Sequence, residues 1–168
     1  LRRGSTHILF QNNILKEEYE KFGIKYSIDP RVIEKEIKEY ELCDIISVPS
    51  TFARQSYIEH GIKPEKVVLN PGGVSSYFQN RIQSPKDPIV RLVYLGALTI
   101  QKGLVYLFEA LRSLNIPLEK YEMWFIGSIS DEMNNSIEKY RMPNWKFLGH
   151  VPHYELQELL SQCDIGIM

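Results

Sequence analysis

A buried strand, a glycine turn and an amphipathic helix follow one another between Val90 and Ala110, and this succession constrains the fold more than any other feature of the chain. Residues 90–95 (VRLVYL) are nearly all apolar, as in a parallel strand that is covered on both faces. Gly96 ends this strand, and Thr99 is a candidate N-cap. Leucine or phenylalanine then recurs at positions 104, 107, 108 and 111, the spacing of a helix that buries one face. The stretch predicts an α/β fold with a parallel sheet.

The same alternation continues to the last residue of the chain. Further strands are predicted at 121–126, 145–148 and 164–168, with helices from about residue 131 and over 153–163. Three of the strands end in glycine, at Gly96, Gly127 and Gly149. Ligands of open parallel sheets bind outside the carboxyl ends of the strands, and glycine there lets the backbone approach a ligand closely. We therefore expect a binding site along this edge.

Lys102 and Gly103 stand where the strand of residues 90–95 feeds its helix. Such a turn offers backbone N–H groups and the positive end of the helix dipole, and Lys102 adds a full charge. The turn is therefore a candidate phosphate site. The sequence contains neither a Walker A loop nor a G-x-G-x-x-G fingerprint, so a solvated lysine at the start of a helix remains the alternative.

The first 70 residues predict a second α/β segment. Helices are expected from near Asn13 to Gly23 and from the capping pair Asp29-Pro30 onward. A strand at 44–48, a helix at 51–60 and a strand at 66–69 then imply parallel pairing. The glycine-rich turn after Asn70 and the polar, proline-bearing stretch beyond it predict a linker. We expect domains at 1–70 and 89–168, joined by a linker at 71–88.

Composition excludes several classes of protein. The chain has 168 residues and a formal net charge of −1, which disfavours a dedicated nucleic-acid binder. No apolar run approaches the roughly 20 residues that span a bilayer, and no signal-peptide pattern is present. Cys43 and Cys163 each lie in an apolar-periodic segment, which indicates buried reduced thiols. We expect a cytoplasmic protein.

Both ends of the chain suggest a piece of a longer protein. The sequence begins at Leu1 without an initiator methionine, and it stops at Met168 inside a predicted strand. A sheet that stops there exposes an edge and apolar surface, so we expect self-association of this chain.

Several segments together resemble a known family. They are ELCDIISVPSTFARQSYIEHGIKPEKVVLNPGGV, YLGALTIQKGLVYLFEAL, WFIG and FLGHVPHYELQELLSQCDIGIM, and their order and spacing over roughly residues 40–168 are similar to those of the retaining nucleotide-sugar glycosyltransferases of family four, the glycosyl transferases group 1. The resemblance implies a GT-B fold: Rossmann-like parallel sheets in an acceptor-side domain (1–70) and a donor-nucleotide domain (89–168), both incomplete here.

The resemblance also implies an activity. A sugar, of hexose type, would pass from a UDP- or GDP-linked diphosphate donor to a glycan or lipid-linked acceptor, with retention of configuration and without a metal or other cofactor. No D-x-D motif is present, and His150 and His153 lack the helical spacing of metal ligands. Peripheral association of the longer protein with the inner face of a membrane is compatible with this family.

Site residues follow from the resemblance position by position. Lys102 matches the lysine of the family pattern G-R-L-x-x-x-K-G, which contacts the donor diphosphate, while Ala97 stands where the pattern has arginine. His7, in RGSTH, matches a polar segment on the acceptor side, the alternative being an exposed loop histidine. We therefore predict Lys102 and His7 as catalytic residues. The predicted donor-binding residues are Gly96, Ala97, Lys102, Gly103, Gly127, Ser128 and Val151.

Two parts of the family site are expected outside this chain. The glutamates of the E-x7-E motif would follow Met168, and the glycine-rich loop of the acceptor-side domain would precede Leu1. We therefore expect this chain alone to be inactive. The alternative hypothesis is a non-catalytic α/β module that binds a nucleotide or serves in assembly.

Overall fold

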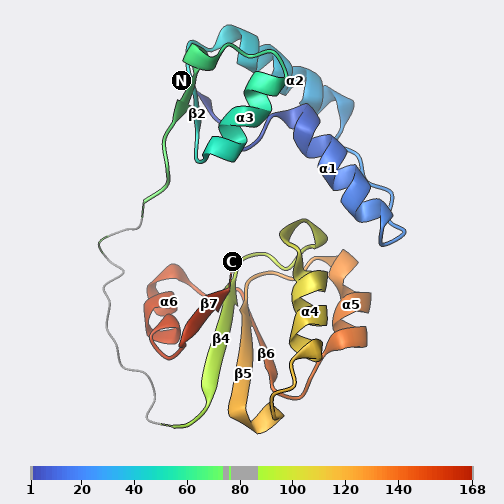
Figure 1. The fold of residues 1–168 in the computed structure, drawn as a ribbon, viewed down its shortest axis with the longest axis vertical. Coiled ribbons are helices and arrows are strands. Elements are labelled where there is room, and N and C mark those ends of the chain that lie inside the picture. The colour runs from blue at the N-terminus through green and yellow to red at the C-terminus, as the bar shows by residue number, and fades with distance from the viewer. Residues whose placement is uncertain (1, 74–75, 77–86, 168) are drawn as a thin grey trace. The chain divides into compact units, whose positions relative to one another are not determined.

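The computed structural model describes residues 2–73, 76 and 87–167. The chain divides into two units, Leu1–Ser75 and Ser76–Met168, and each contains a parallel sheet covered by helices (Figure 1). This confirms the predicted α/β class. Most of the predicted linker at 71–88 lies outside the described residues.

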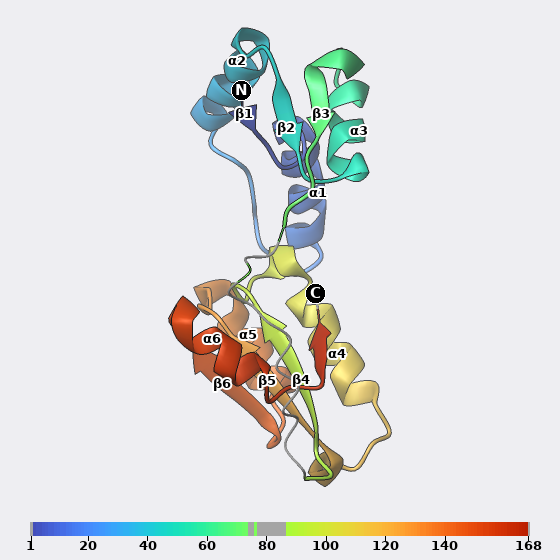
Figure 2. The ribbon, with the colours of Figure 1, turned by 90° about the vertical axis from the view of Figure 1, so that its left-hand side faces the viewer.

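The first unit has a three-stranded parallel sheet in the order β1-β2-β3 (Figure 2). Its strands are β1 (Arg2–Arg3), β2 (Ile46–Val48) and β3 (Val67–Leu69). Its helices are α1 (Ile8–Glu20), α2 (Pro30–Leu42) and α3 (Thr51–Glu59). The predicted parallel β-α-β unit is confirmed in β2, α3 and β3, whereas β1 was not predicted.

Helix α1 begins five residues before the predicted start at Asn13, because groups distant in sequence satisfy its first amides. The Ile8 N–H donates to the hydroxyl of Tyr40 at 3.2 Å, and the Leu9 N–H donates to Nδ1 of His7 at 3.3 Å. The His7 N–H donates to Oγ of Ser56 at 2.9 Å. Helix α2 has the predicted cap, with the Asp29 carboxylate accepting from the Arg31 N–H at 2.9 Å.

The second unit has a four-stranded parallel sheet in the order β6-β5-β4-β7. Its strands are β4 (Val90–Leu95), β5 (Tyr121–Ile126), β6 (Trp145–Gly149) and β7 (Ile165–Ile167). Its helices are α4 (Leu104–Ser113), α5 (Asn134–Tyr140) and α6 (His153–Leu160). The chain adds β5 and β6 on one side of β4 and then returns to pair β7 with its other side. This reversal of strand order is a topological switch point.

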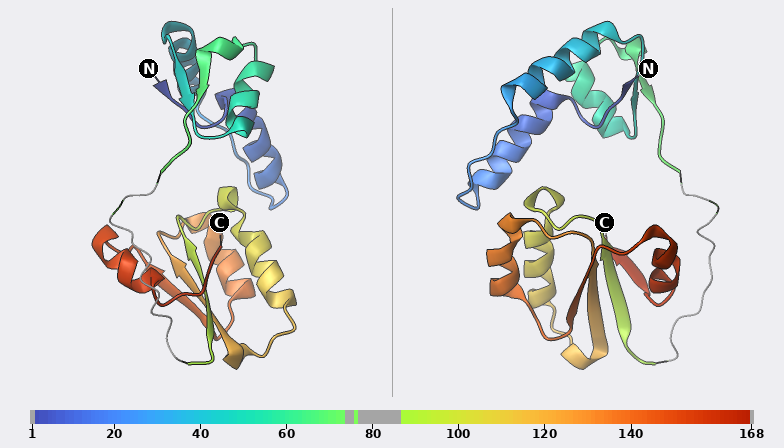
Figure 3. Two further views of the ribbon diagram at one scale, coloured as in Figure 1. Left: turned by 60° about the vertical axis from the view of Figure 1, so that its left-hand side comes forward. Right: turned by 180° about the vertical axis from the view of Figure 1, so that it is seen from behind.

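Helices cover both faces of this sheet, α4 and α5 on one face and α6 on the other (Figures 1 and 3). On the first face, the ring of Phe108 lies 5.4 Å from that of Phe125 and 5.1 Å from that of Trp145, measured between centroids. On the other, Leu156 of α6 packs with Trp124 and its strand neighbours. Burial on both faces accounts for the near-continuous apolar strands.

The segment after Gly96 differs from the prediction. Residues Ile100–Lys102 form a 3₁₀ turn, and the α-helix begins only at Leu104, after Gly103 at φ 72°. Thr99 precedes the 3₁₀ turn and makes no side-chain capping hydrogen bond. Leu104, Phe108 and Leu111 are buried, as predicted for the helix.

Among the described residues, no helix is both long and apolar enough to cross a membrane. Cys43 and Cys163 are both free thiols and are half-buried. At the edge strand β7, Ile165 is 51 % exposed; self-association through this edge stays a prediction.

Candidate functional site

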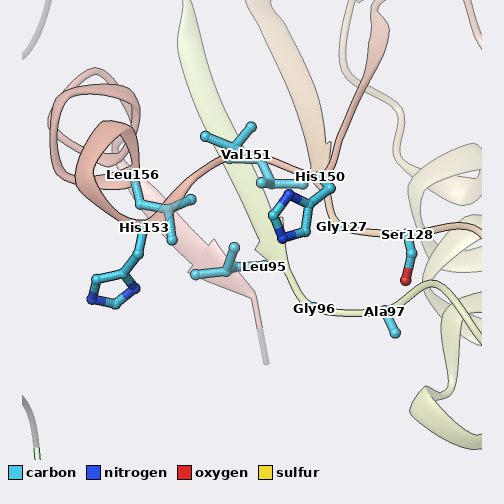
Figure 4. Close-up of a pocket in the computed structure, with 10 residues that line it drawn as sticks. Leu95, Gly96, Ala97, Gly127, Ser128, His150, Val151, His153 and Leu156 are labelled. Atoms are coloured by element: carbon cyan, nitrogen blue, oxygen red, sulfur yellow. The ribbon is translucent and has the colours of Figure 1, made fainter.

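A pocket of about 320 Å³ opens at the carboxyl edge of the second sheet (Figure 4). The ends of β4 and β5, the turns that follow them, and the segment from β6 into α6 form it. The lining residues are Leu95, Gly96, Ala97, Ile126, Gly127, Ser128, His150, Val151, His153 and Leu156. The pocket therefore lies outside the carboxyl ends of the strands, where ligands of open parallel sheets bind.

Three glycines meet at this edge because parallel strands place their carboxyl ends on the same side of the sheet. The Gly96 N–H donates to the carbonyl of Ile126 at 2.9 Å, and the Gly127 N–H donates to the carbonyl of Gly149 at 2.8 Å. A bulge in the pairing of β5 with β6 sets Gly149 opposite Ile126. A Cβ at Gly127 would overlap the carbonyl oxygen of Gly96. The strand ends thus form a tight floor whose amides at Gly96 and Gly127 are already used.

One part of the pocket is aliphatic, with Leu95, Val151 and Leu156 grouped on one side in Figure 4. The polar side chains of the lining are those of Ser128, His150 and His153. Within the described part of the chain, no lysine, arginine, aspartate or glutamate lines this pocket. The lining suits a flat, uncharged group with polar edges better than a polyanion.

The turn that leaves the pocket after Ala97 is held by the protein's own groups. The Ile100 N–H donates to Oε1 of Glu132 at 3.0 Å, and the Gly103 N–H donates to the carbonyl of Ile100 at 2.8 Å. The prediction that this turn offers free amides to a phosphate is therefore wrong for those two groups. Lys102 itself is exposed on the turn and is not among the pocket-lining residues.

The structure thus brings together Gly96, Ala97, Gly127, Ser128 and Val151 of the predicted donor-binding set. Lys102 and Gly103 lie on the turn beyond it. Their predicted contact with a donor diphosphate stays a prediction.

His7 belongs to the first unit and is buried, with 4 % of its surface exposed. The alternative of an exposed loop histidine is wrong. Its ring stacks on that of His60 at 4.3 Å and contacts the rings of Tyr40 and Tyr57 at 5.0 and 5.5 Å. Burial, and then the neighbouring His60, lower the pKa of His7 to about 4, against the opposing effect of the Glu36 carboxylate. His7 therefore caps α1 as a neutral base; its catalytic role stays a prediction.

Sequence reasoning missed part of the pocket. Leu95, Ile126 and Leu156 were predicted only as core residues, and His153 was considered only as a metal ligand. The available signal was the run GHVPH, which places two polar rings directly after a strand end at the predicted ligand edge. Among the described residues, no three His, Cys, Asp or Glu side chains form a group that could hold a metal ion.

A parallel sheet that is covered by helices on both faces and has a pocket at its carboxyl edge defines a Rossmann-like α/β unit. The family model of the glycosyl transferases group 1 matches residues 77–168, and the chain belongs to this family. It is 26 % identical over 141 residues to the uncharacterized glycosyltransferase MJ1607 of Methanocaldococcus jannaschii, covering 81 % of this chain and 35 % of that protein. The chain thus spans about a third of the length of this curated relative.

Solved structures of GT-B glycosyltransferases share the fold. Anabaena HepE in complex with UDP and glucose has a TM-score of 0.63 at 16 % identity, over 81 % of this chain and 40 % of HepE. The lipopolysaccharide outer core galactosyltransferase WaaB, in its apo form, has a TM-score of 0.55 at 14 % identity, over 96 % of this chain and 48 % of WaaB. The predicted GT-B class is confirmed.

Proposed function

We propose that the protein containing this chain transfers a hexose from a UDP- or GDP-linked donor to a glycan or lipid-linked acceptor, with retention of configuration and without a metal. The observation that carries the proposal is the pocket at the carboxyl edge of β4, β5 and β6, in a chain of the group 1 family. Similar structures support it: HepE is in complex with UDP-glucose, and a TarM mutant of S. aureus is in complex with UDP and α-GlcNAc-glycerol.

In this proposal the second unit holds the donor and the first unit belongs to the acceptor side. The nucleoside occupies the pocket, and the diphosphate extends past Ala97 toward the turn that carries Lys102. Breaking the bond between sugar and phosphate leaves negative charge on the diphosphate. A fixed ammonium group stabilises that charge as it grows, so a metal ion is not needed for this step.

The test uses the longer protein that contains this chain and compares two lysine variants. Lys102→Ala should lower kcat by about a hundredfold or more, as expected when one charge-stabilising group is removed from a transition state. The matched control is Lys120→Ala, which removes the same charge from an exposed residue. Lys120 ends a 3₁₀ turn just before β5, at the end of β5 that lies away from the pocket. Equal activities of the two variants would contradict the role of Lys102.

Retention and metal independence have their own measurements. Proton NMR of the first-formed product should show the anomeric configuration of the donor, and turnover should persist in excess EDTA. An inverted product, or activity restored only by a divalent ion, would contradict the respective part of the proposal. For the location of the longer protein we propose the cytoplasm, with peripheral contact to the inner membrane face; cell fractionation tests this.

The second candidate is a non-catalytic α/β module that binds a nucleotide or serves in assembly. It is favoured by the uncharged lining of the pocket and by the position of Lys102 outside that lining. A longer protein that binds UDP or GDP but neither transfers nor hydrolyses a nucleotide sugar would support this candidate.

A further inference from the structure

We propose that Glu132 is a positioning residue for Lys102: its carboxylate fixes the backbone turn from which the Lys102 ammonium reaches the donor diphosphate. This inference rests on the proposed function. Residues Ile100–Lys102 form a single 3₁₀ turn, and Thr99 before it makes no side-chain capping hydrogen bond. Instead, Oε1 of Glu132 accepts the Ile100 N–H at 3.0 Å, from 32 positions further along the chain. The acceptor that this turn lacks locally therefore comes from the connection after β5.

The connections that follow β4 and β5 are joined at two successive points. Nearer the strands, the carbonyl of Leu98 accepts from the N–H and the hydroxyl of Ser130, at 3.1 and 3.0 Å. Farther from the strands, the Ile100 N–H donates to Glu132. This second contact lies two residues before Lys102, so it controls the backbone of the lysine more directly than the first.

Both partners of this second contact are anchored in the core. Ile100 is 3 % exposed, and Met133, the neighbour of Glu132, is fully buried. On the other side of Lys102, Gly103 takes φ 72° and its N–H donates to the carbonyl of Ile100 at 2.8 Å. The backbone of Lys102 is thus held on both sides, while its side chain is exposed. An N–H in such a segment needs an acceptor, so loss of the carboxylate should let the turn rearrange and move the lysine.

Glu132 acts through Lys102 and not on the donor itself. It is not among the residues that line the pocket, and a carboxylate would repel a diphosphate. The ammonium of Lys102, in contrast, stabilises the charge on the leaving diphosphate only where it lies close to that charge. A misplacement of about 1 Å can cost up to about a hundredfold in rate.

The test measures kcat, and KM for the donor, in the longer protein that contains this chain. Glu132→Ala should lower kcat about tenfold and change KM less, because the misplaced lysine stabilises the transition state less well. Glu132→Gln keeps an oxygen acceptor and should retain most of the turnover. The double variant Lys102→Ala/Glu132→Ala should be as slow as Lys102→Ala, since a positioning residue has no effect once the group that it positions is gone.

The matched control is Glu122→Ala, at the amino end of β5 and away from the pocket. The Glu122 carboxylate accepts the Nε1–H of Trp124 at 2.8 Å, so its removal also lowers the stability of the second unit. At temperatures well below its Tm, this variant should have the kcat of the wild type. Amide exchange at Ile100 should accelerate in Glu132→Ala, but not in Glu132→Gln or Glu122→Ala.

Each contrary result has a distinct meaning. A wild-type kcat in Glu132→Ala, beside a slow Lys102→Ala, refutes the positioning role and leaves the proposed function standing. The role is also refuted if Glu132→Gln or Glu122→Ala is as slow as Glu132→Ala, because charge or general stability then explains the loss. A double variant much slower than Lys102→Ala shows that Glu132 acts independently of Lys102. Wild-type turnover in Lys102→Ala, or no sugar transfer by the longer protein, overturns this inference together with the corresponding part of the proposed function.

Discussion

Acidification should destabilise the first unit selectively, because His7 is buried there as a neutral base. Its Nδ1 accepts the N–H of Leu9 at the start of α1, and a protonated Nδ1 could not accept it. The ring also stacks on that of His60 at 4.3 Å, so a charge on both rings would be repulsive. These contacts tie the protonation of one side chain to the stability of α1.

The magnitude follows from the pKa of His7, which falls from 6.5 to about 4 on folding. The unfolded chain therefore binds a proton at higher pH than the folded chain does. Stability from the neutral ring is complete above pH 6.5 and is lost as the pH falls toward 4. At about 1.36 kcal/mol per pH unit, the wild-type unit should lose about 2 kcal/mol between pH 7 and pH 5.

The control variant is His7→Asn, because asparagine is a good N-cap acceptor and does not titrate. Amide hydrogen exchange in α1, measured at pH 7 and pH 5 and corrected for intrinsic rates, gives the opening free energy of the first unit. Trp124 and Trp145 both lie in the second unit, so tryptophan fluorescence during urea unfolding measures the stability of the second unit separately. An equal loss of α1 protection in wild type and His7→Asn would show that protonation of His7 does not cause the loss of stability.

Three further predictions concern local stability. Gly127→Ala should destabilise the second unit by about 2 kcal/mol or more, because the added Cβ overlaps the Gly96 carbonyl. Gly149→Ala should cost about 1 kcal/mol, because its Cβ meets no atom within 4 Å. Equal losses of unfolding free energy in urea would contradict this difference. Glu132→Ala should cost about 1–2 kcal/mol by removing the acceptor of a backbone N–H, and Glu132→Gln should cost less, as measured by thermal unfolding; a glutamine variant as unstable as the alanine variant would count against it. Ser50→Ala should cost about 1 kcal/mol through the lost cap of α3, seen as faster amide exchange in that helix; unchanged exchange would exclude the cap as a stabilising contact.

The sequence was sufficient for the elements that local rules determine. The apolar runs at 90–95 and 121–126 are β4 and β5, and the capping pair Asp29-Pro30 starts α2. The three glycines that end strands do meet at one edge, because parallel strands place their carboxyl ends together. The class of fold and the location of the pocket could therefore be predicted.

Features that depend on distant partners could not be predicted. Helix α1 starts at Ile8 because Ser56 and Tyr40, from other helices, satisfy amides at its start. Strand β1 consists of two arginines and exists only through its pairing with β2. The turn after Thr99 is 3₁₀ in form, and Glu132 from the next connection accepts its Ile100 amide. Leu156 reaches the pocket only because α6 covers the opposite face of the sheet from α4.

The most direct test of the donor site is a ¹⁵N–¹H NMR titration of the 168-residue chain with UDP and with GDP. We expect saturable shifts of the Gly96, Gly127 and Val151 amides, with α1 unaffected. Saturable shifts confined to the first unit, or no shifts with either nucleotide, would contradict a nucleotide pocket at the carboxyl edge of this sheet.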